Sequence, residues 1–337
     1  MKTFYIWNIH DLYQPKIDKF ILENSKIPQG YEFKQVPANI EFKDLFNFLK
    51  TNNAYAVIHR NEHGVMWCTK EWISLTNKCI ENGIPVLSFD FGYFNHYKSF
   101  MVDYYYKNCI SSIYYKWNLI EPTFEWDSMP DYIKTYKKKV LDKVNLYKNE
   151  TPPLNLQNIV VIWGQWTTEL IKYHFYENEK HINMDIWMLK LIDIIKDRGF
   201  TPVIKMSPVK SLKWYKEIQH KVPTFVGTKE HQQELPGTIY EEDINYKLIA
   251  HAKYHIINCS SVSNELVLSD SKVIAMGRSW FDNLNVFYEP KNWDNILNYQ
   301  QPSPENINKW FNWWKYSQCM MDDLPSKLIQ LRESIKL

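Results

Sequence analysis

The chain has 337 residues, of which 45% are apolar and 23% are charged, and its formal net charge is +2. This composition excludes a disordered or fibrous protein, and the length allows two domains that each bury a core. A net charge this close to zero neither requires nor excludes a polyanionic partner, so such a partner would need a local patch of charge.

The sequence carries no sign of a membrane span or of an export signal. No stretch approaches the roughly 18 uninterrupted apolar residues of a span, and the first residues lack a signal peptide's cleavage site. The five cysteines are scattered without a C-x-x-C pair, which excludes a disulfide framework and a zinc ribbon. The aromatic-rich, glycine-poor composition is typical of AT-rich genomes of some bacteria and large phages. We therefore predict a cytoplasmic protein, in a bacterial cell or a phage-infected host.

The first half alternates short apolar runs with amphipathic stretches, as β-α-β units do. We expect strands at residues 3–9, 54–60 and 84–91, and a helix at 68–83 that ends at Gly83. A basic helix at 132–148 is followed by two prolines, which cannot continue a helix, so we take residues 149–155 as a linker.

The second half repeats this alternation. We expect strands at 158–165, 201–208, 223–228, 254–260 and 272–277, and helices at 185–199 and 241–252. Helices are also expected near the C-terminus. The pattern predicts an α/β fold with two Rossmann-like, doubly wound domains at residues 1–150 and 151–300, and with C-terminal helices at 301–337 that pack back across the domains.

Polar residues follow three of the strands expected in the second domain. They are Gly164 and Gln165, then Lys205 and Ser207, and then Ser260 and Ser261. Because the carboxyl ends of parallel strands share one edge of a sheet, where ligands bind, we expect these residues to lie together.

The serine run has two interpretations that the residues leave open. Ser260 or Ser261 can cap a helix that begins at Val262, and the free N–H groups of its first turn would then suit a phosphate. Alternatively, the serines are a helix cap and nothing more.

Three charged residues fit the first interpretation. Lys205 can add a point charge to the same anion, and Arg278 can add a bidentate fork. Glu265 can accept hydrogen bonds from a ribose diol; the alternative is that it is only an acid near a helix N-terminus.

Residues 258–281, NCSSVSNELVLSDSKVIAMGRSWF, resemble a segment of the capsular polysaccharide transferases of the Kdo-transferring type. In that family an N-S-S-V run precedes a helix that contains Glu, then a strand and a short loop. VIKMSP (203–208) is similar to the family's K-x-H-P element, with Met206 and Ser207 in place of the usual residues. GIPVLSFDFGYF (83–94) and FMVDYYYKNCISS (100–112) are similar to its pattern of Asp and Gly, a second Asp, Asn and a serine run.

The resemblance implies the GT-B architecture, with two facing Rossmann-like domains, the nucleotide sugar in the second and the acceptor in the first. It implies that Lys205 lies near the phosphates. It implies that four residues contact the nucleotide: Ser260, Ser261, Ser263 and Glu265. It also implies that three residues face the acceptor: Asp90, Asp103 and Asn108.

An inverting transfer needs a base for the acceptor hydroxyl. Asp90 is the first candidate, His59 at a neighbouring strand end is the second, and Asp103 is a further catalytic candidate. Asp90 is explained equally well as a turn carboxylate. Since no D-x-D element occurs, we expect a metal-independent enzyme that needs no cofactor besides its nucleotide-sugar cosubstrate.

A competing motif, HRNEH at residues 59–63, fits the H-x-x-E-H pattern of a group of zinc peptidases. That pattern binds metal only on a helix, whereas these residues directly follow an expected strand. We therefore expect no metal site here.

The acceptor has two candidates. The resemblance implies a capsule or lipopolysaccharide glycan, whereas the phage-like composition and the basic helix favour a hydroxymethylated pyrimidine in phage DNA. Residues expected to contact the acceptor are Asn108, Ser111, Lys137 and Lys138. The alternative function is a non-catalytic binder of sugar nucleotides. The sugar, the stereochemical outcome and the oligomeric state stay open.

Overall fold

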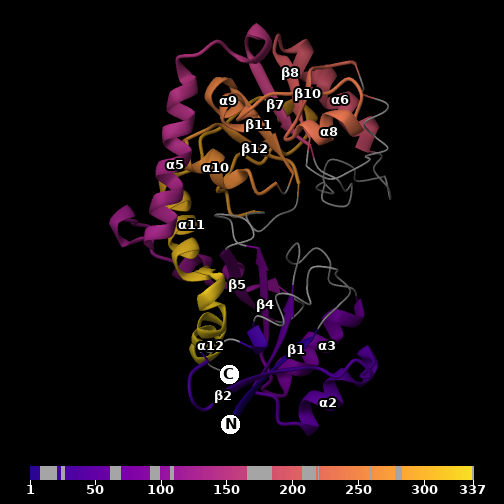
Figure 1. Cartoon of the computed structure of the whole chain (residues 1–337), viewed down its shortest axis with the longest axis vertical. Coiled ribbons are helices and arrows are strands. Elements are labelled where there is room, and N and C mark those ends of the chain that lie inside the picture. The colour runs from indigo at the N-terminus through magenta and orange to yellow at the C-terminus, as the bar shows by residue number, and fades with distance from the viewer. Residues whose placement is uncertain are drawn as a thin grey trace. The chain divides into compact units, whose positions relative to one another are not determined.

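The computed structural model describes residues 1–7, 21–23, 27–60, 70–91, 99–106, 110–164, 184–206, 218, 220–258, 260–277 and 283–335. The chain divides into two compact units (Figure 1). Unit 1 comprises Met1–Phe124 and Asn308–Leu337, and unit 2 comprises Glu125–Ile307. None of the described helices is long and apolar enough to cross a membrane.

The sheet of unit 1 has the strand order β13-β5-β4-β3-β1-β2, and β6 pairs with β5. Strands β1 to β4 pair in parallel, whereas β5 is antiparallel to β4, β6 and β13. The strands are β1 (Lys2–Trp7), β2 (Tyr31–Gln35), β3 (Ala56–Arg60), β4 (Val86–Phe91), β5 (Ser99–Tyr106), β6 (Ile110–Ser111) and β13 (Gln318–Met320).

Two helix layers bury the two faces of this sheet. On one face, side chains of β1, β3 and β4 pack against α2 (Leu45–Thr51) and α3 (Lys70–Glu81). On the other face, Phe4, Ile58 and Leu87 pack with residues of α12 (Leu324–Ser334). Alternate residues of each strand therefore belong to different cores, as the two-residue period of a strand requires. The unit also contains α4 (Ser112–Lys116) and most of α11 (Pro304–Ser317).

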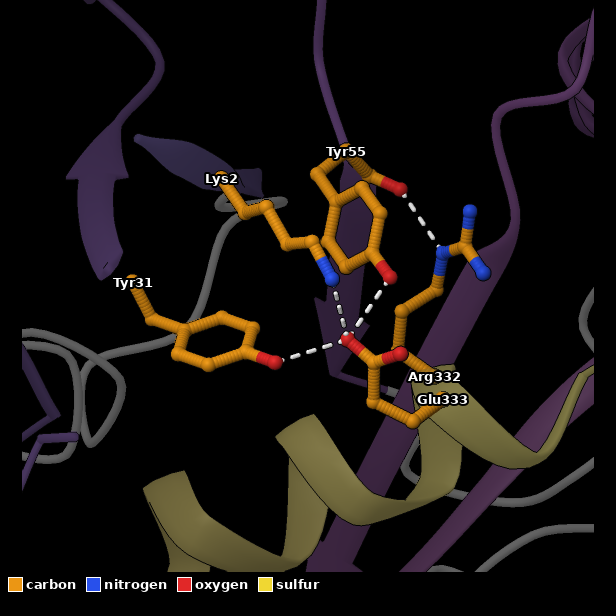
Figure 2. A network of polar contacts seen from close by, with 5 residues as sticks. All are labelled: Lys2, Tyr31, Tyr55, Arg332 and Glu333. Atoms are coloured by element: carbon orange, nitrogen blue, oxygen red, sulfur yellow. Dashed lines mark hydrogen bonds and ion pairs between the residues drawn. The ribbon is translucent and has the colours of Figure 1, made fainter. Parts of the chain in front are cut away.

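A polar cluster holds α12 at the amino ends of the parallel strands (Figure 2). One carboxylate oxygen of Glu333 accepts hydrogen bonds from Lys2 Nζ at 2.8 Å, Tyr31 Oη at 2.8 Å and Tyr55 Oη at 2.7 Å. Arg332 Nε donates to the carbonyl oxygen of Tyr55 at 2.9 Å, and its guanidinium lies 4.1 Å from the centre of that ring. We call these five residues the Glu333 cluster.

The sheet of unit 2 is parallel throughout its described strands, in the order β10-β9-β8-β7-β11-β12. The strands are β7 (Ile159–Trp163), β8 (Thr201–Lys205), β9 (Thr224–Val226), β10 (Ile239–Tyr240), β11 (Tyr254–Ile257) and β12 (Val273–Ala275). The helices include α5 (Asp131–Lys148), α6 (Met184–Asp197), α8 (Lys229–Glu234), α9 (Ile244–His251) and α10 (Ser263–Leu268). Strands β8 to β10 lie on one side of β7, and β11 and β12 lie on the other, so the order of the strands along the chain reverses between β7 and β11. Ligands of open parallel sheets bind at such a switch point.

The predicted α/β fold with two Rossmann-like units is confirmed, and two helices end where their glycines predict. Gly83 and Gly199 have φ angles of 76° and 75°, a left-handed conformation that glycine adopts without strain. The residue after each glycine donates its N–H to a carbonyl of the last helical turn, at 2.9 Å for Ile84 and 3.1 Å for Phe200. The antiparallel strands β5, β6 and β13 are not in the expected set.

The units divide at other residues than the expected boundary at 150. Helix α5, expected in the first domain, packs against α9 and α10 of unit 2. Its Lys143 pairs with the carboxylate of Asp243, which also accepts a 2.7 Å hydrogen bond from Tyr147 Oη. The C-terminal segment from Asn308 onward belongs to unit 1, because α12 contributes to the core of that unit.

Candidate functional site

The carboxyl-terminal edge of the unit 2 sheet brings together the residues expected after its first two strands. Trp163 at the end of β7 lies opposite Lys205 at the end of β8. The N–H of Gly164 donates to the carbonyl oxygen of Lys205 at 2.8 Å. Since β11 pairs with β7 on the side away from β8, the serine run that follows β11 begins at the same edge.

Lys205 is the most unusual residue at this edge, because its side chain is only 6% exposed. Its ammonium donates to the carbonyl oxygen of Met206 at 2.9 Å, and burial lowers its pKa to about 8. Among the described residues no carboxylate contributes to this pKa shift. A Cβ atom at Gly227, just beyond β9, would lie 3.7 Å from the ammonium nitrogen. The described part of the chain thus buries the ammonium without supplying a counter-charge.

A buried Trp-His pair lies on the strands beside Lys205. Trp163 Nε1 donates to Nδ1 of His255 at 3.3 Å, and burial lowers the pKa of His255 to about 3. The imidazole is therefore neutral and carries its proton on Nε2, which has no hydrogen-bond partner among the described residues. This hydrogen bond joins β7 to β11 beside the switch point.

The serine run does not cap the helix that follows it, so the expected cap is wrong. The cap position is occupied by Val262 in a helical conformation, and α10 begins only at Ser263. Ser260 Oγ instead accepts a 3.5 Å hydrogen bond from the N–H of Val262 inside the preceding turn. Ser261 is exposed and Ser260 is half-buried, whereas Ser263 is 2% exposed. A helix of six residues also gives the run little dipole to attract an anion.

Glu265 lies against α5. Tyr136 Oη donates to its Oε1 atom, and its Oε2 atom is buried without a partner among the described residues. Burial raises the pKa of Glu265, and the hydrogen bond from Tyr136 opposes that shift. One of the two oxygens expected to meet a ribose is thus already bound by the protein.

Two buried asparagines beside the serines are not among the residues predicted for the site. Asn258 directly follows β11 and is 2% exposed, and Asn264 in α10 is fully buried. Nδ2 of Asn264 donates to the carbonyl oxygen of Ser261 at 2.8 Å. The Oδ1 atoms of both asparagines are buried without a partner in the described part of the chain. Asn258 begins the segment N-C-S-S-V (258–262), which resembles the family's N-S-S-V run and was the available signal.

Polar residues of unit 1 form a row across its sheet. His59 of β3 lies opposite Ser88 of β4, which lies opposite Asp103 of β5. The ring of His59 lies 4.2 Å from the ring of Trp72, and burial lowers the pKa of His59 to about 3. Such a weak base holds an abstracted proton poorly, so this environment disfavours His59 as the catalytic base.

Asp103 has a local structural role. It is 3% exposed, and its carboxylate accepts hydrogen bonds from the N–H of Tyr104 at 2.8 Å and of Ser112 at 3.2 Å, and from the hydroxyl of Ser112. These bonds join β5 to the first residue of α4. A carboxylate saturated in this way stabilises the fold and is poorly placed to accept a proton from a substrate.

Other expected site residues are described in part or not at all. Asp90 lies in β4 opposite Met101, and Ser111 lies in β6 opposite Tyr105, but their side chains lie outside the description. Four further residues lie outside the described part of the chain: Asn108, Gln165, Ser207 and Arg278.

The two lysines expected to bind the acceptor are partly engaged within unit 2. Lys137 Nζ lies 3.5 Å from the centre of the Trp126 ring, and burial lowers the pKa of this lysine. Lys138 forms an exposed ion pair of 2.5 Å with Asp142, one helical turn away. Both lysines thus make contacts within unit 2.

The described residues contain no group of three or more His, Cys, Asp or Glu side chains that could hold a metal ion. His59, the first residue of the H-x-x-E-H match, lies in strand β3 and not in a helix. The geometry that a zinc peptidase requires is therefore not formed at this residue. The rest of the motif lies outside the described residues.

No family model matches the sequence, and no curated protein matches it. Two solved structures of KpsC from Thermosulfurimonas dismutans are similar in fold, each with a TM-score of 0.51. The β-Kdo 2,7-transferase is 10% identical, and the alignment covers 98% of this chain and 100% of that one. The β-Kdo 2,4-transferase is 12% identical, and the alignment covers 97% of this chain and 98% of that one. The two Rossmann-like units thus have the GT-B fold of these transferases.

Proposed function

We propose that this protein is a glycosyltransferase that moves a sugar from a nucleotide-sugar donor to a hydroxyl group of a polymeric glycan. The observation that carries the proposal is the buried ammonium of Lys205 at the carboxyl edge of the unit 2 sheet. In a GT-B fold, a cation at this edge is suited to the phosphates of a nucleotide sugar.

The energetics of Lys205 favour an anionic ligand. A buried charge without a counter-ion is costly, and a bound diphosphate would offset this cost. The negative charge on the leaving diphosphate grows during sugar transfer, and a fixed cation stabilises that charge with little reorganisation. The positively charged form of Lys205 would thus serve both binding and catalysis.

The fold supports the division of labour between the units. The similar structures are named as Kdo transferases, and the resemblance implies the donor in the second domain and the acceptor in the first. We assign the donor to the β7–β8–β11 edge of unit 2, with Gly164, Lys205 and the serine run. No cofactor or metal is required by this scheme.

Asp90 is the base that the proposal favours for an inverting reaction. The environments of His59 and Asp103 disfavour both as bases. Asp90 lies near the carboxyl end of β4, the edge at which parallel α/β sheets bind their ligands. It would accept the proton of the acceptor hydroxyl as the sugar is transferred.

A glycan acceptor is favoured over DNA because Lys137 and Lys138 are engaged by Trp126 and Asp142. DNA affinity depends on free cations that displace counterions from the phosphates. The hydroxymethylated base remains an alternative prediction, and so does the non-catalytic binder.

The test is a release assay with the full chain. CMP-, UDP-, GDP- and ADP-linked sugars are each incubated with capsule oligosaccharide, lipopolysaccharide oligosaccharide or hydroxymethylated DNA, and the released nucleotide is measured by chromatography. We expect release with one donor and a glycan, abolished by Lys205→Met and unchanged by Lys253→Met at an exposed lysine of the same unit. Release with DNA alone would contradict the glycan acceptor, and no release with any pair would contradict the enzyme.

A further inference from the structure

Three tyrosines form a row at the amino edge of the unit 2 sheet. Tyr254 is the first residue of β11, and its ring centre lies 6.0 Å from that of Tyr299, which lies 5.8 Å from that of Tyr288. We call these three residues the tyrosine row. Lys205 ends β8 at the opposite edge of the same parallel sheet. The row is therefore separate from the edge to which we assign the donor.

The rings of the tyrosine row are neither fully buried nor fully exposed. All three contact the apolar core of unit 2, and all three are partly accessible to solvent. A half-exposed tyrosine offers an apolar ring and a polar hydroxyl at once, and for this reason tyrosine is enriched where proteins bind their partners. Three adjacent tyrosines of this kind indicate a binding surface.

One ammonium and one carboxylate lie beside the row. Lys272 Nζ lies 5.8 Å from the ring centre of Tyr254 and 5.9 Å from that of Tyr299, close to the limit of about 6 Å for a cation–π contact. Burial, and next the charge of Asp270, raise the pKa of Tyr299 to about 12. Lys272 and Asp270 are both exposed, and neither forms an ion pair within the described part of the chain. Each can therefore bond to a ligand without breaking an ion pair of the fold.

The chemistry of this surface selects a sugar. A pyranose presents C–H groups on the faces of its ring, which pack on aromatic rings, and hydroxyls at its rim, which both donate and accept hydrogen bonds. Lys272 supplies donors and Asp270 supplies acceptors. The hydroxyl of Tyr299 donates to Oε1 of Gln301 at 3.2 Å and can still accept.

The pairing of one cation with one anion disfavours a phosphate-rich partner. Nucleic acids and anionic membranes are held by several cations, whose charge a neighbouring carboxylate would oppose. Beside Tyr299 the charges of Lys272 and Asp270 balance. A polyhydroxyl ligand fits this balance better than a polyanion does.

The separation of the two edges decides which part of a glycan can bind here. The five residues of β8 span about 15 Å, at about 3.3 Å per residue. A single sugar is too small to contact the tyrosine row and Lys205 together, whereas a polymer is long enough. A second contact with the same polymer raises its local concentration at the catalytic edge without any new contact there.

We propose that the tyrosine row, with Lys272 and Asp270, is a second glycan-binding site, which holds sugar residues of the polymeric acceptor away from the reacting hydroxyl. This inference rests on the proposed function and deepens it, because it makes the length of the acceptor a determinant of binding. The site does not contact the reacting atoms. It should therefore lower KM for long acceptors and leave kcat and short acceptors unaffected.

Calorimetric titration of the full chain with capsule polysaccharide, in the absence of nucleotide, tests the inference. We expect the wild type to bind the long polysaccharide at least about tenfold more tightly than a disaccharide of the same glycan. Lys272→Met and Asp270→Asn should each weaken polysaccharide binding by about tenfold. Asparagine suits the left-handed backbone of residue 270, whose φ angle is 54°, so neither variant should change the melting temperature.

Two control variants locate the effect. Lys229→Met removes another exposed lysine of unit 2, whose Nζ lies 5.8 Å from the ring centre of Tyr240, and should bind the polysaccharide as the wild type does. Lys205→Met should also bind the polysaccharide normally, although it releases no nucleotide. In the release assay, Lys272→Met should raise KM for the polysaccharide by about tenfold and leave kcat and KM for the disaccharide unchanged.

Three results would overturn the inference. One is polysaccharide affinity within about twofold of the wild type in both Lys272→Met and Asp270→Asn. Another is a wild type that does not bind the polysaccharide. The third is tighter binding by Asp270→Asn, together with wild-type binding to double-stranded DNA or to phosphatidylglycerol vesicles, which would identify a polyanion site.

The proposed function is tested separately. In each of these three cases, nucleotide release with a glycan acceptor would leave the glycosyltransferase assignment standing. Absence of release with every donor and acceptor would contradict that assignment, whether or not the polysaccharide binds.

Discussion

Lys205 and Met206 are joined by a 2.9 Å hydrogen bond from the lysine ammonium to the carbonyl oxygen of its own neighbour. The bond satisfies one of three ammonium hydrogens, and burial lowers the pKa of the group to about 8. The free protein therefore retains, at some cost in stability, a cation that an anionic ligand can use.

Replacing Lys205 with Met should stabilise the fold and weaken anion binding. The lowered pKa corresponds to a cost of roughly 3 kcal/mol for the charged form in the folded state. Lys205→Met should therefore raise the free energy of unfolding by about 1–3 kcal/mol and weaken pyrophosphate binding at least tenfold. Urea denaturation and calorimetry measure the two effects. A variant that loses stability and binds pyrophosphate normally would contradict this role.

In the wild type, a rise in pH should also change stability and pyrophosphate binding in opposite directions. Between pH 8 and pH 10.5 the unfolded chain holds the Lys205 proton and the folded chain releases it. The free energy of unfolding should therefore rise with pH in this range by up to about 3 kcal/mol relative to Lys205→Met. Pyrophosphate affinity should fall over the same range, because only the charged ammonium attracts the anion. Parallel titrations of wild type and Lys205→Met isolate this contribution.

The contact between Tyr136 and Glu265 should contribute to the stability of unit 2. Tyr136→Phe removes the tyrosine donor to Glu265 Oε1, while Oε2 is buried without a partner among the described residues. We expect the free energy of unfolding to fall by about 1–3 kcal/mol in urea denaturation. Tyr316→Phe, at an exposed tyrosine, is the control and should change nothing. Equal stabilities of the two variants would show that the contact is energetically silent.

The Glu333 cluster should make the stability of unit 1 depend on pH in the acidic range. Hydrogen bonds from Lys2, Tyr55 and Tyr31 lower the pKa of Glu333 to about 2. The carboxylate therefore stabilises the fold above its ordinary pKa near 4.5, and this contribution is lost as the pH falls toward 2. Glu333→Gln should lower the urea midpoint at pH 7 and approach the wild type near pH 2. Glu305→Gln, which lies outside the cluster, should not show this convergence.

If Asp90 is the base, its loss should affect turnover more than binding. Asp90→Asn is expected to lower kcat by about 10²- to 10⁴-fold with little change in KM for the donor. Asp103→Asn should instead lower the melting temperature, because Asp103 accepts three hydrogen bonds of the fold. Steady-state kinetics and thermal unfolding of both variants distinguish the roles. An Asp90→Asn enzyme with full kcat would contradict the assignment.

Local sequence signals predicted the elements well where the deciding interactions are local. The ends of α3 and α6 follow from Gly83 and Gly199, whose left-handed conformation stops a helix without help from distant residues. The division between units does not follow from local signals. Pro152 and Pro153 mark a chain break, but α5 is fixed to unit 2 by Asp243, a residue about a hundred positions further along.

The position of the candidate site could be predicted from the sequence, whereas the roles of its residues could be predicted less well. Strand ends marked Gly164 and Lys205, which the structure brings together. Burial of Lys205, the bond between Tyr136 and Glu265 and the acceptors of Asn258 depend on tertiary packing, so residue type alone could not reveal them.

Unit 1 consists of two segments that are far apart in the sequence, and this affects the order in which the units can fold during synthesis. Strand β13 and helix α12 complete the sheet and core of unit 1, yet they are translated after the whole of unit 2. Domains fold as units while the chain emerges from the ribosome. Unit 2 can therefore finish folding first, and the N-terminal strands must wait for the last thirty residues before their apolar face is covered.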